Sequence, residues 1–257
     1  MGVKGARLFL KRYQSKSASL ANFVVPGLTV YIDLLGCYYL DLLYYAKQPD
    51  GYNRFALFLI RQLGGRPLAT VHVIVDGEAS FEKQDTHSER LAALDTGIKK
   101  LDLAIDLLTT KLPTACRRKA VEVAKKKTFR LSNEDLEAFG VSLVDVGINI
   151  TRASHEADVE IARLTLVNAG CVLTKDGDFF FHSNARLVAY PIRKNKSGMV
   201  WSFFHVDRAK RELLPSCTVE LANEIFKFLH ITASNDYNKN LWGFTLKNNF
   251  EWVTFLL

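Results

Sequence analysis

Two aspartates that each follow a short apolar run constrain the fold more than any other feature of this chain. Residues 30–32 run directly into Asp33, and residues 71–75 run directly into Asp76. Consecutive β-branched and apolar positions are typical of strands buried on both faces of a parallel sheet. A helix-like stretch at 40–63 separates the two runs. The order strand, helices, strand predicts a βαβ unit.

The second half of the chain shows the same pairing of strand-like and acidic segments. A strand-like segment at 147–150 leads to Ser154, a good helix N-cap, and then to a helix at about 155–168. A strand at 171–174 again ends next to acidic residues. Further strands are expected at 186–192 and 199–206, and a further helix at 219–229.

The length and the apolar content predict one α/β domain. A chain of 257 residues with 48% hydrophobic residues can bury one substantial core. We expect a Rossmann-like, mostly parallel sheet flanked by helices. Its parts are the amino-terminal half of the sheet at 1–80, a helical insertion at 81–140, the inner half of the sheet at 141–225 and a short helical end at 226–257.

Composition excludes several classes of protein. No apolar run approaches the roughly 20 residues that span a bilayer, so membrane insertion is not expected. The four cysteines form no Cys-x-x-Cys pair, which argues against a zinc knuckle or a disulfide framework. The net charge of +7 suggests a polyanionic partner, since Lys and Arg gain affinity by releasing counterions from phosphates.

Six carboxylates are expected at one edge of the sheet, because the carboxyl ends of parallel strands meet there. Carboxylates this close repel one another unless cations neutralise them, and oxygen ligands without His or Cys favour Mg²⁺ or Mn²⁺ over zinc. Two such ions could activate water against a phosphodiester. The alternative is that the acids are ordinary turn residues and helix starters. The candidate ligands are Asp33, Asp76, Glu156, Asp158, Asp176 and Asp178.

With these acids identified, the chain resembles the flap-endonuclease and XPG superfamily over nearly its whole length. The similarity lies in the order of several motifs, of which the two strand-end aspartates are part. The other motifs are Met1-Gly2-Val3-Lys4-Gly5, Glu156-Ala157-Asp158, Thr174-Lys175-Asp176-Gly177-Asp178 and Asn235-Asp236-Tyr237. Several details, such as Asp178-Phe179, resemble the asteroid-like branch more than the replication enzymes.

The resemblance implies a PIN-like fold and a function. It implies structure-specific hydrolysis of nucleic acid by two metal ions, at a 5′-flap or 5′-end, with DNA expected over RNA. Asp236 would be a further metal ligand, and Gly2 and Lys4 would contact nucleic acid. Lys83 and Arg90 would be catalytic cations on a gateway helix, with a solvated helix face as the alternative.

An aromatic residue and a basic stretch complete the candidate nucleic-acid surface. By the same resemblance Tyr39 would stack on a terminal base, although core packing is the alternative. The basic stretch would contact the strand backbone, form an arch or serve as a nuclear-import signal. It comprises Arg117, Arg118, Lys119, Lys125, Lys126 and Lys127.

The location follows from two basic segments. We expect a nuclear or nucleocytoplasmic protein, on the strength of the basic stretch at 117–127. The basic amino terminus at 1–32 could instead be read as a mitochondrial presequence, which is the less favoured location.

Departures from the family pattern leave other functions open. The loop that grips duplex phosphates in the family keeps one glycine here, Gly243, and no sliding-clamp-binding tail is evident. A replication role is therefore not supported. The alternatives are a catalytically weak or inactive nucleic-acid-binding module, or a protein-interaction module of the asteroid-like type with a partner at the apolar end, 250–257.

Overall fold

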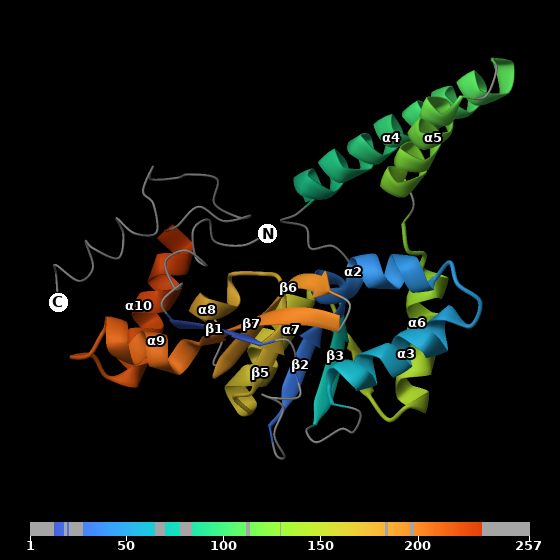
Figure 1. Cartoon of the computed structure of the whole chain (residues 1–257). Helices are drawn as coiled ribbons and strands as arrows, with labels where there is room; N and C mark the ends of the chain where they lie inside the picture. Colours follow the sequence, from blue (N-terminus) through green and yellow to red (C-terminus); the bar gives the residue numbers. More distant parts are fainter. Residues whose placement is uncertain are drawn as a thin grey trace.

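A mixed sheet forms the centre of the chain, and helices lie on both of its faces, as the computed structural model shows (Figure 1). The structure describes residues 13–17, 20, 28–64, 70–77, 84–111, 114–128, 130–182, 185–195 and 198–232. Its sheet has the order β1-β7-β6-β5-β2-β3-β4. Strands β6, β5, β2, β3 and β4 run parallel, while β7 is antiparallel to both β6 and β1. The predicted α/β class is confirmed.

The parallel strands occur where apolar runs were found in the sequence. The central strand β2 (Val30–Asp33) pairs with β3 (Val71–Val75) on one side and β5 (Cys171–Leu173) on the other. Both segments that join these strands cross over through helices, as parallel pairing requires. The remaining strands are β4 (Asn149–Arg152), β6 (Leu187–Asn195), β7 (Gly198–His205) and β1 (Gln14–Ser17).

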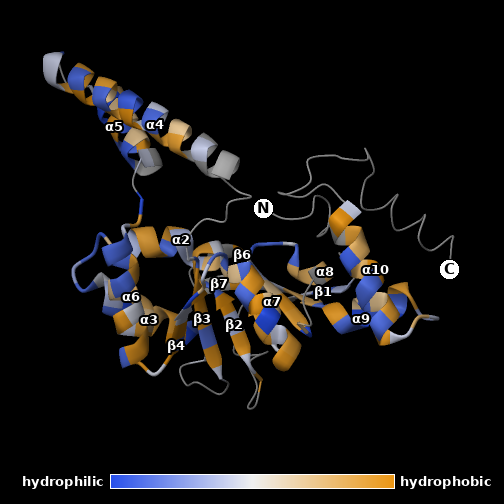
Figure 2. Ribbon diagram, turned by 180° about the vertical axis from the view of Figure 1, so that it is seen from behind, coloured by the Kyte–Doolittle hydropathy of each residue, from blue (hydrophilic) through white to orange (hydrophobic). Residues whose placement is uncertain are grey.

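Alternate residues of β2 belong to two separate cores, because successive side chains of a strand point to opposite faces. Val30 and Ile32 pack in one cluster, and Tyr31 packs in the other. The Ile32 face is covered by α2 (Leu34–Tyr45), α3 (Gly51–Gln62) and α6 (Asn133–Asp145). The Tyr31 face is covered by α7 (Ala157–Val167), α8 (Phe179–His182), α9 (Val206–Leu213) and α10 (Val219–Thr232). Apolar strands between these helices are visible in Figure 2.

Two long helices stand away from the sheet as a hairpin. They are α4 (Gln84–Thr110) and α5 (Ala115–Thr128), which pack against each other. Figure 1 shows the pair projecting beyond α2, on the side of the sheet where α2 begins. The helical insertion expected at 81–140 contains this hairpin, in the part of it that the structure describes. Among the described helices, none combines the length and apolarity needed to cross a bilayer.

Several element boundaries differ from the sequence-based expectation. The first helix begins at Leu34, directly after β2, whereas we expected it at residue 40, because Asp33 caps it from inside the strand. The strand expected at 147–150 is shifted to Asn149–Arg152. The segment after β7 turns at once into α9, and this helix was not predicted because it has few apolar residues. Two short elements, β1 and α8, were also not predicted.

Candidate active site at the carboxyl edge of the sheet

The topology brings the acidic segments to one edge of the sheet. Asp33 ends the central strand β2, Asp76 follows β3, and Asp176 and Asp178 follow β5. Because β2 pairs in parallel with both β3 and β5, these three strand ends are neighbours. Helix α7 begins after β4, the partner of β3, and brings Asp158 to the same edge. Four separate stretches of sequence therefore supply acids to one place.

Asp33 is held rigidly by two hydrogen bonds. The backbone N–H of Gly36 donates to its Oδ1 at 2.8 Å, which makes Asp33 the N-cap of α2. The hydroxyl of Thr174 donates to its Oδ2 at 2.9 Å. Asp33 is only 9% exposed, so it is a buried carboxylate with both oxygens oriented.

Thr174 connects Asp33 to the acidic loop after β5. Its hydroxyl oxygen also accepts from the backbone N–H of Asp176 at 3.0 Å, and Asp176 Oδ1 accepts from the N–H of Asp178 at 3.0 Å. The phenol of Tyr190, on β6, donates to the carbonyl of Asp176 at 2.6 Å. This chain of bonds sets the direction of the loop that carries both aspartates, and it holds Asp178 at 4% exposure.

Asp76 fastens the start of α7 to the end of β3. The backbone N–H of Ala157, the first residue of α7, donates to Asp76 Oδ1 at 2.8 Å. The expected cap, Ser154, is wrong: the N-cap position is Glu156, and the helix starts three residues after Ser154. Asp76 thereby satisfies one of the first-turn N–H groups that have no partner within the helix. A negative charge there also suits the helix dipole.

Gly77 lets β3 and the segment before α7 approach closely. Its N–H donates to the carbonyl of His155 at 2.6 Å. A Cβ at this position would lie 2.0 Å from the Ala153 carbonyl oxygen, a distance that forces the backbone apart. The glycine is therefore required by the contact that carries α7, and with it Asp158, to this edge.

We expect Gly77→Ala to lower the free energy of unfolding by about 2 kcal/mol, the cost of forcing extra volume into a packed contact. Urea unfolding measures it. Gly140→Ala is the matched control, because a Cβ on that buried glycine of α6 would meet Ile150 at 3.4 Å, an ordinary contact. Equal stability of Gly77→Ala and the unchanged chain would contradict the close approach.

The site concentrates negative charge around Asp33. Burial is the largest influence on Asp33, and with the smaller effect of the nearby charges of Asp76 and Asp158 it raises the pKa to about 6. The hydrogen bonds from Gly36 and Thr174 act in the opposite direction, because they favour the ionised form. Even with two donors bound, the ionised form of Asp33 is therefore less favourable here than in an exposed aspartate, and the site would gain from a bound cation.

The donors match Mg²⁺ in chemistry, because all of them are carboxylate oxygens. Their arrangement is more open than a finished coordination sphere. Within the described ranges, no three His, Cys, Asp or Glu side chains form a group that could hold a metal ion. Glu156 and Asp158 lie half-buried at the start of α7, and Asp158 Oδ1 accepts from the N–H of Val159 at 2.8 Å.

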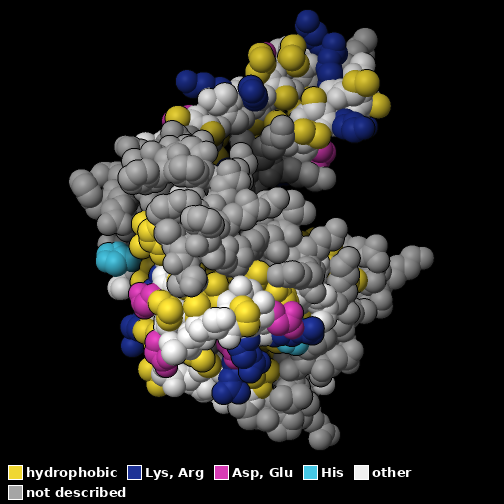
Figure 3. Space-filling view, turned by 90° about the vertical axis from the view of Figure 1, so that its left-hand side faces the viewer, with side chains coloured by type: hydrophobic (Ala, Val, Ile, Leu, Met, Phe, Trp, Pro, Cys, Tyr) yellow, Lys and Arg dark blue, Asp and Glu magenta, His cyan; other side chains and the backbone are white. Residues whose placement is uncertain are grey.

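The remaining predicted site residues fall into two groups. Tyr39 is half-buried on α2, and the basic stretch lies on the hairpin, where Arg118, Lys119 and Lys125 are exposed and Arg117 is half-buried. Figure 3 shows Lys and Arg side chains gathered on that hairpin. Arg90 lies on α4, but its side chain and those of Lys126 and Lys127 are outside the described part. Gly2, Lys4, Lys83 and Asp236 also lie outside it.

Residues other than the acids shape this site and were not singled out. Gly36 approaches Asp33 so closely that a Cβ on it would lie 1.9 Å from Oδ2. The signal that could have pointed to this contact is Asp33 itself, since an aspartate directly before a helix is a preferred N-cap. Tyr190 could not be found in this way, since only the pairing of β6 with β5 brings it to the acidic loop.

Comparison with solved structures identifies the fold of this chain. No family model matches the sequence, and neither does any curated protein. The solved catalytic core of Rad2 in complex with DNA substrate has a TM-score of 0.59 at 15% identity, over 98% of this chain and 68% of that one. Human GEN1 in complex with Holliday junction DNA has a TM-score of 0.58 at 16% identity, over 98% of this chain and 55% of that one. Both are XPG/flap-endonuclease proteins with a PIN-like fold, so the PIN-like fold expected from the motifs is confirmed.

Proposed function

We propose that this chain is a metal-dependent nuclease that hydrolyses phosphodiester bonds in DNA at the carboxyl edge of its sheet. The observation that carries the proposal is the convergence of acids from β2, β3, β5 and α7 on one edge of the sheet, beside the buried Asp33. Its support from other proteins is the fold shared with DNA-bound Rad2 and GEN1. RNA is the alternative substrate, and the panel of substrates below separates the two.

The acids would hold Mg²⁺, with Mn²⁺ as a substitute. The proposed ligands are Asp33, Asp76, Glu156, Asp158, Asp176 and Asp178, with Asp236 as a further one. When bound, divalent ions neutralise phosphate charge and lower the pKa of water, so that a nucleophile is available at neutral pH. The chain's own contribution is orientation: Thr174 and Tyr190 hold the acidic loop, and the N-cap bond fixes Asp33.

The carboxyl edge by itself repels a phosphate, so attraction must come from elsewhere on the chain. The projecting hairpin carries the exposed cations of α5, and Figure 1 places it on the same side of the sheet as the start of α2. We propose that the hairpin contacts the strand backbone and that Lys83 and Arg90 stabilise charge developing on the phosphate. The position of α5 beyond α2 supports an approach of the strand from that side.

The test is cleavage of labelled single-stranded, duplex, 5′-flap and RNA substrates with Mg²⁺, with Mn²⁺ or with EDTA. Cutting that needs the metal and is lost on replacement of the acids establishes the nuclease. The substrate that is cleaved fastest then shows which nucleic-acid structure the protein recognises. No cutting of any substrate, by a chain that still binds nucleic acid, rejects the enzyme.

A second function has an observation in its favour. The acids in the described part of the chain do not form a ready group for an ion, and four of them bind backbone N–H groups of the chain itself. A module that only binds nucleic acid or a protein partner, without turnover, would not need an ion site, and structural roles would account for these acids. Retained binding without cutting would select this function.

The hairpin cations give a prediction that holds for either function. Replacing Arg117, Arg118, Lys119 and Lys125 with Gln should weaken single-strand binding at low salt and flatten its salt dependence. The slope of log K against log salt should fall by up to about 3, since each phosphate contact contributes about 0.7. Fluorescence anisotropy at several salt concentrations measures both effects.

The control removes the same number of cations elsewhere. Arg61, Arg163, Arg208 and Lys227 are exposed on other helices, and replacing them with Gln should leave the slope nearly unchanged. Equal losses in the two variants would show that net charge, and not the hairpin, governs binding.

A further inference from the structure

A separate cavity lies at the opposite edge of the sheet from the acids. It has a volume of about 350 Å³ and is lined from α9, α10 and the residues that precede β5 and β6. Ala169 and Arg186 stand before those two parallel strands, so they mark the amino ends of the sheet. The N–H of Val206, which begins α9, donates to the Arg186 carbonyl at 3.1 Å and brings α9 to this end.

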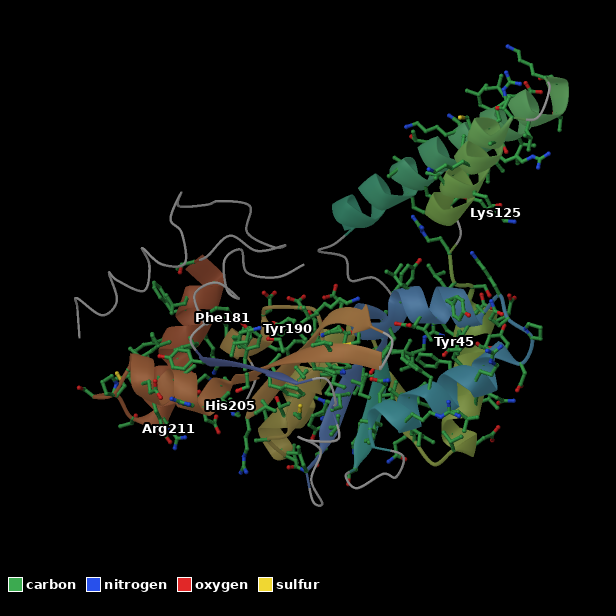
Figure 4. The ribbon with its side chains drawn as sticks, in the orientation of Figure 1. Tyr45, Lys125, Phe181, Tyr190, His205 and Arg211 are labelled. Carbon is green, nitrogen blue, oxygen red and sulfur yellow. The ribbon has the colours of Figure 1, made fainter. Side chains whose placement is uncertain are left out.

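The cavity wall is rich in positive charge. Among the described residues that line it, Arg186, Lys210 and Arg211 stand against one carboxylate, Asp207. Within the described residues, neither arginine makes an ion pair. Figure 4 labels Arg211 on α9, and Figure 3 is seen from the side of the molecule that carries α9 and α10. Two guanidinium groups without a carboxylate partner suit an anionic ligand, which they can bind through several N–H donors at once.

Lys210 is a buried cation at the cavity wall. It is 7% exposed, its Nζ donates to Asn223 Oδ1 at 2.8 Å, and it stands 5.6 Å from the ring centroid of Phe226. Burial lowers its pKa to about 8, so the ammonium form still prevails at neutral pH. The amide, the aromatic face and the nearby Asp207 compensate this buried charge in part, and an anion in the adjoining cavity would complete its neutralisation.

We propose that this cavity binds a small phosphate-bearing molecule. The three cations would bind the phosphate, while Leu214, Val219 and Ala222 offer an apolar wall to the rest of the ligand. A volume of about 350 Å³ lies at the lower end of the range for small-molecule sites. That size exceeds inorganic phosphate and suits a mononucleotide. The site is distinct from the acidic edge and does not depend on the nuclease proposal.

Isothermal titration calorimetry at fixed ionic strength tests this site with AMP, inorganic phosphate and adenosine. AMP should bind more tightly than inorganic phosphate, and adenosine should bind at least about tenfold more weakly than AMP. Tighter binding of inorganic phosphate would identify free phosphate as the ligand. Binding of adenosine as tight as that of AMP, or no binding of either phosphate compound, would overturn the proposal.

Arg186 and Arg211 are both exposed, so replacing them should leave the fold intact. Arg186→Gln with Arg211→Gln should weaken AMP binding at least about tenfold, since two charge-assisted contacts are lost. Arg208→Gln is the matched control: Arg208 is an exposed neighbour on α9, paired with Glu212 at 2.6 Å and outside the cavity. Unchanged affinity in the double variant, or an equal loss in the control, would overturn the site. Asp178→Asn should bind AMP normally, which separates this result from the cleavage tests.

Discussion

Replacing both Asp176 and Asp178 with Asn should abolish metal-dependent cleavage, with a loss on the order of 10³-fold or more in the single-turnover rate. The two residues share one loop, and Asn keeps the shape and the Oδ1 acceptor that binds the Asp178 N–H. The variant therefore removes negative charge and leaves the loop in place. Nucleic-acid affinity should stay within a few-fold, because binding relies on cations elsewhere.

Two further variants keep this result interpretable. Asp178 is 4% exposed, so circular dichroism and urea unfolding must show that the double variant is folded. The single change Asp176→Asn, at a half-buried position, should also reduce the rate strongly. Asp145→Asn, at an exposed acid on the last turn of α6, is the control and should cleave normally. Undiminished cleavage by the double variant would reject the acidic loop as part of the site.

Replacing Asp33 with Asn should stabilise the chain in EDTA at pH 7.5 by about 3 kcal/mol. The pKa of Asp33 is raised from 3.8 to about 6, and each unit of difference corresponds to about 1.4 kcal/mol. The folded chain holds the Asp33 proton more tightly than the unfolded chain does. The stability that the unchanged chain gains from this proton is therefore fully present below pH 3.8. It is lost as the pH rises through about 6. Asn carries no charge and avoids the loss.

The pH dependence is therefore the diagnostic measurement. Urea unfolding in EDTA should show a difference between Asp33→Asn and the unchanged chain that shrinks from about 3 kcal/mol at pH 7.5 toward zero near pH 4. Asp95→Asn, at an exposed position of α4, should show no such trend. A variant that is less stable than the unchanged chain at pH 7.5 would mean that the hydrogen bonds of Asp33 outweigh its charge repulsion.

Adding Mg²⁺ to the same experiment tests the metal without any cleavage assay. An ion that binds only the folded chain adds stability that grows with its concentration. The unchanged chain should gain stability with Mg²⁺ and Asp33→Asn should gain less, so the advantage of the variant narrows. An advantage that is independent of Mg²⁺ would show that these acids do not hold the ion under those conditions.

Strands and their acidic ends could be predicted because their signals are local. Each apolar run of β2, β3 and β5 ends in or beside an acid, and pairing in parallel puts such ends at one edge whatever the details of the helices. The hairpin helices were predictable for the same reason, since α4 and α5 contact mainly each other. Local signals failed where a distant residue took over, as when Asp76 bound the first turn of α7 in place of Ser154.

The fold class, the strand-end acids and the basic stretch can all be read from the order of residues, because period, composition and motif order are properties of neighbouring residues. How those parts act on one another depends on the folded arrangement. It placed Thr174 and Tyr190 around the acidic loop, raised the pKa of Asp33 mainly by burying its carboxylate, and lined a cationic cavity with Lys210 at the far edge. Burial and charge repulsion depend on distances through space, and spacing along the chain does not contain them.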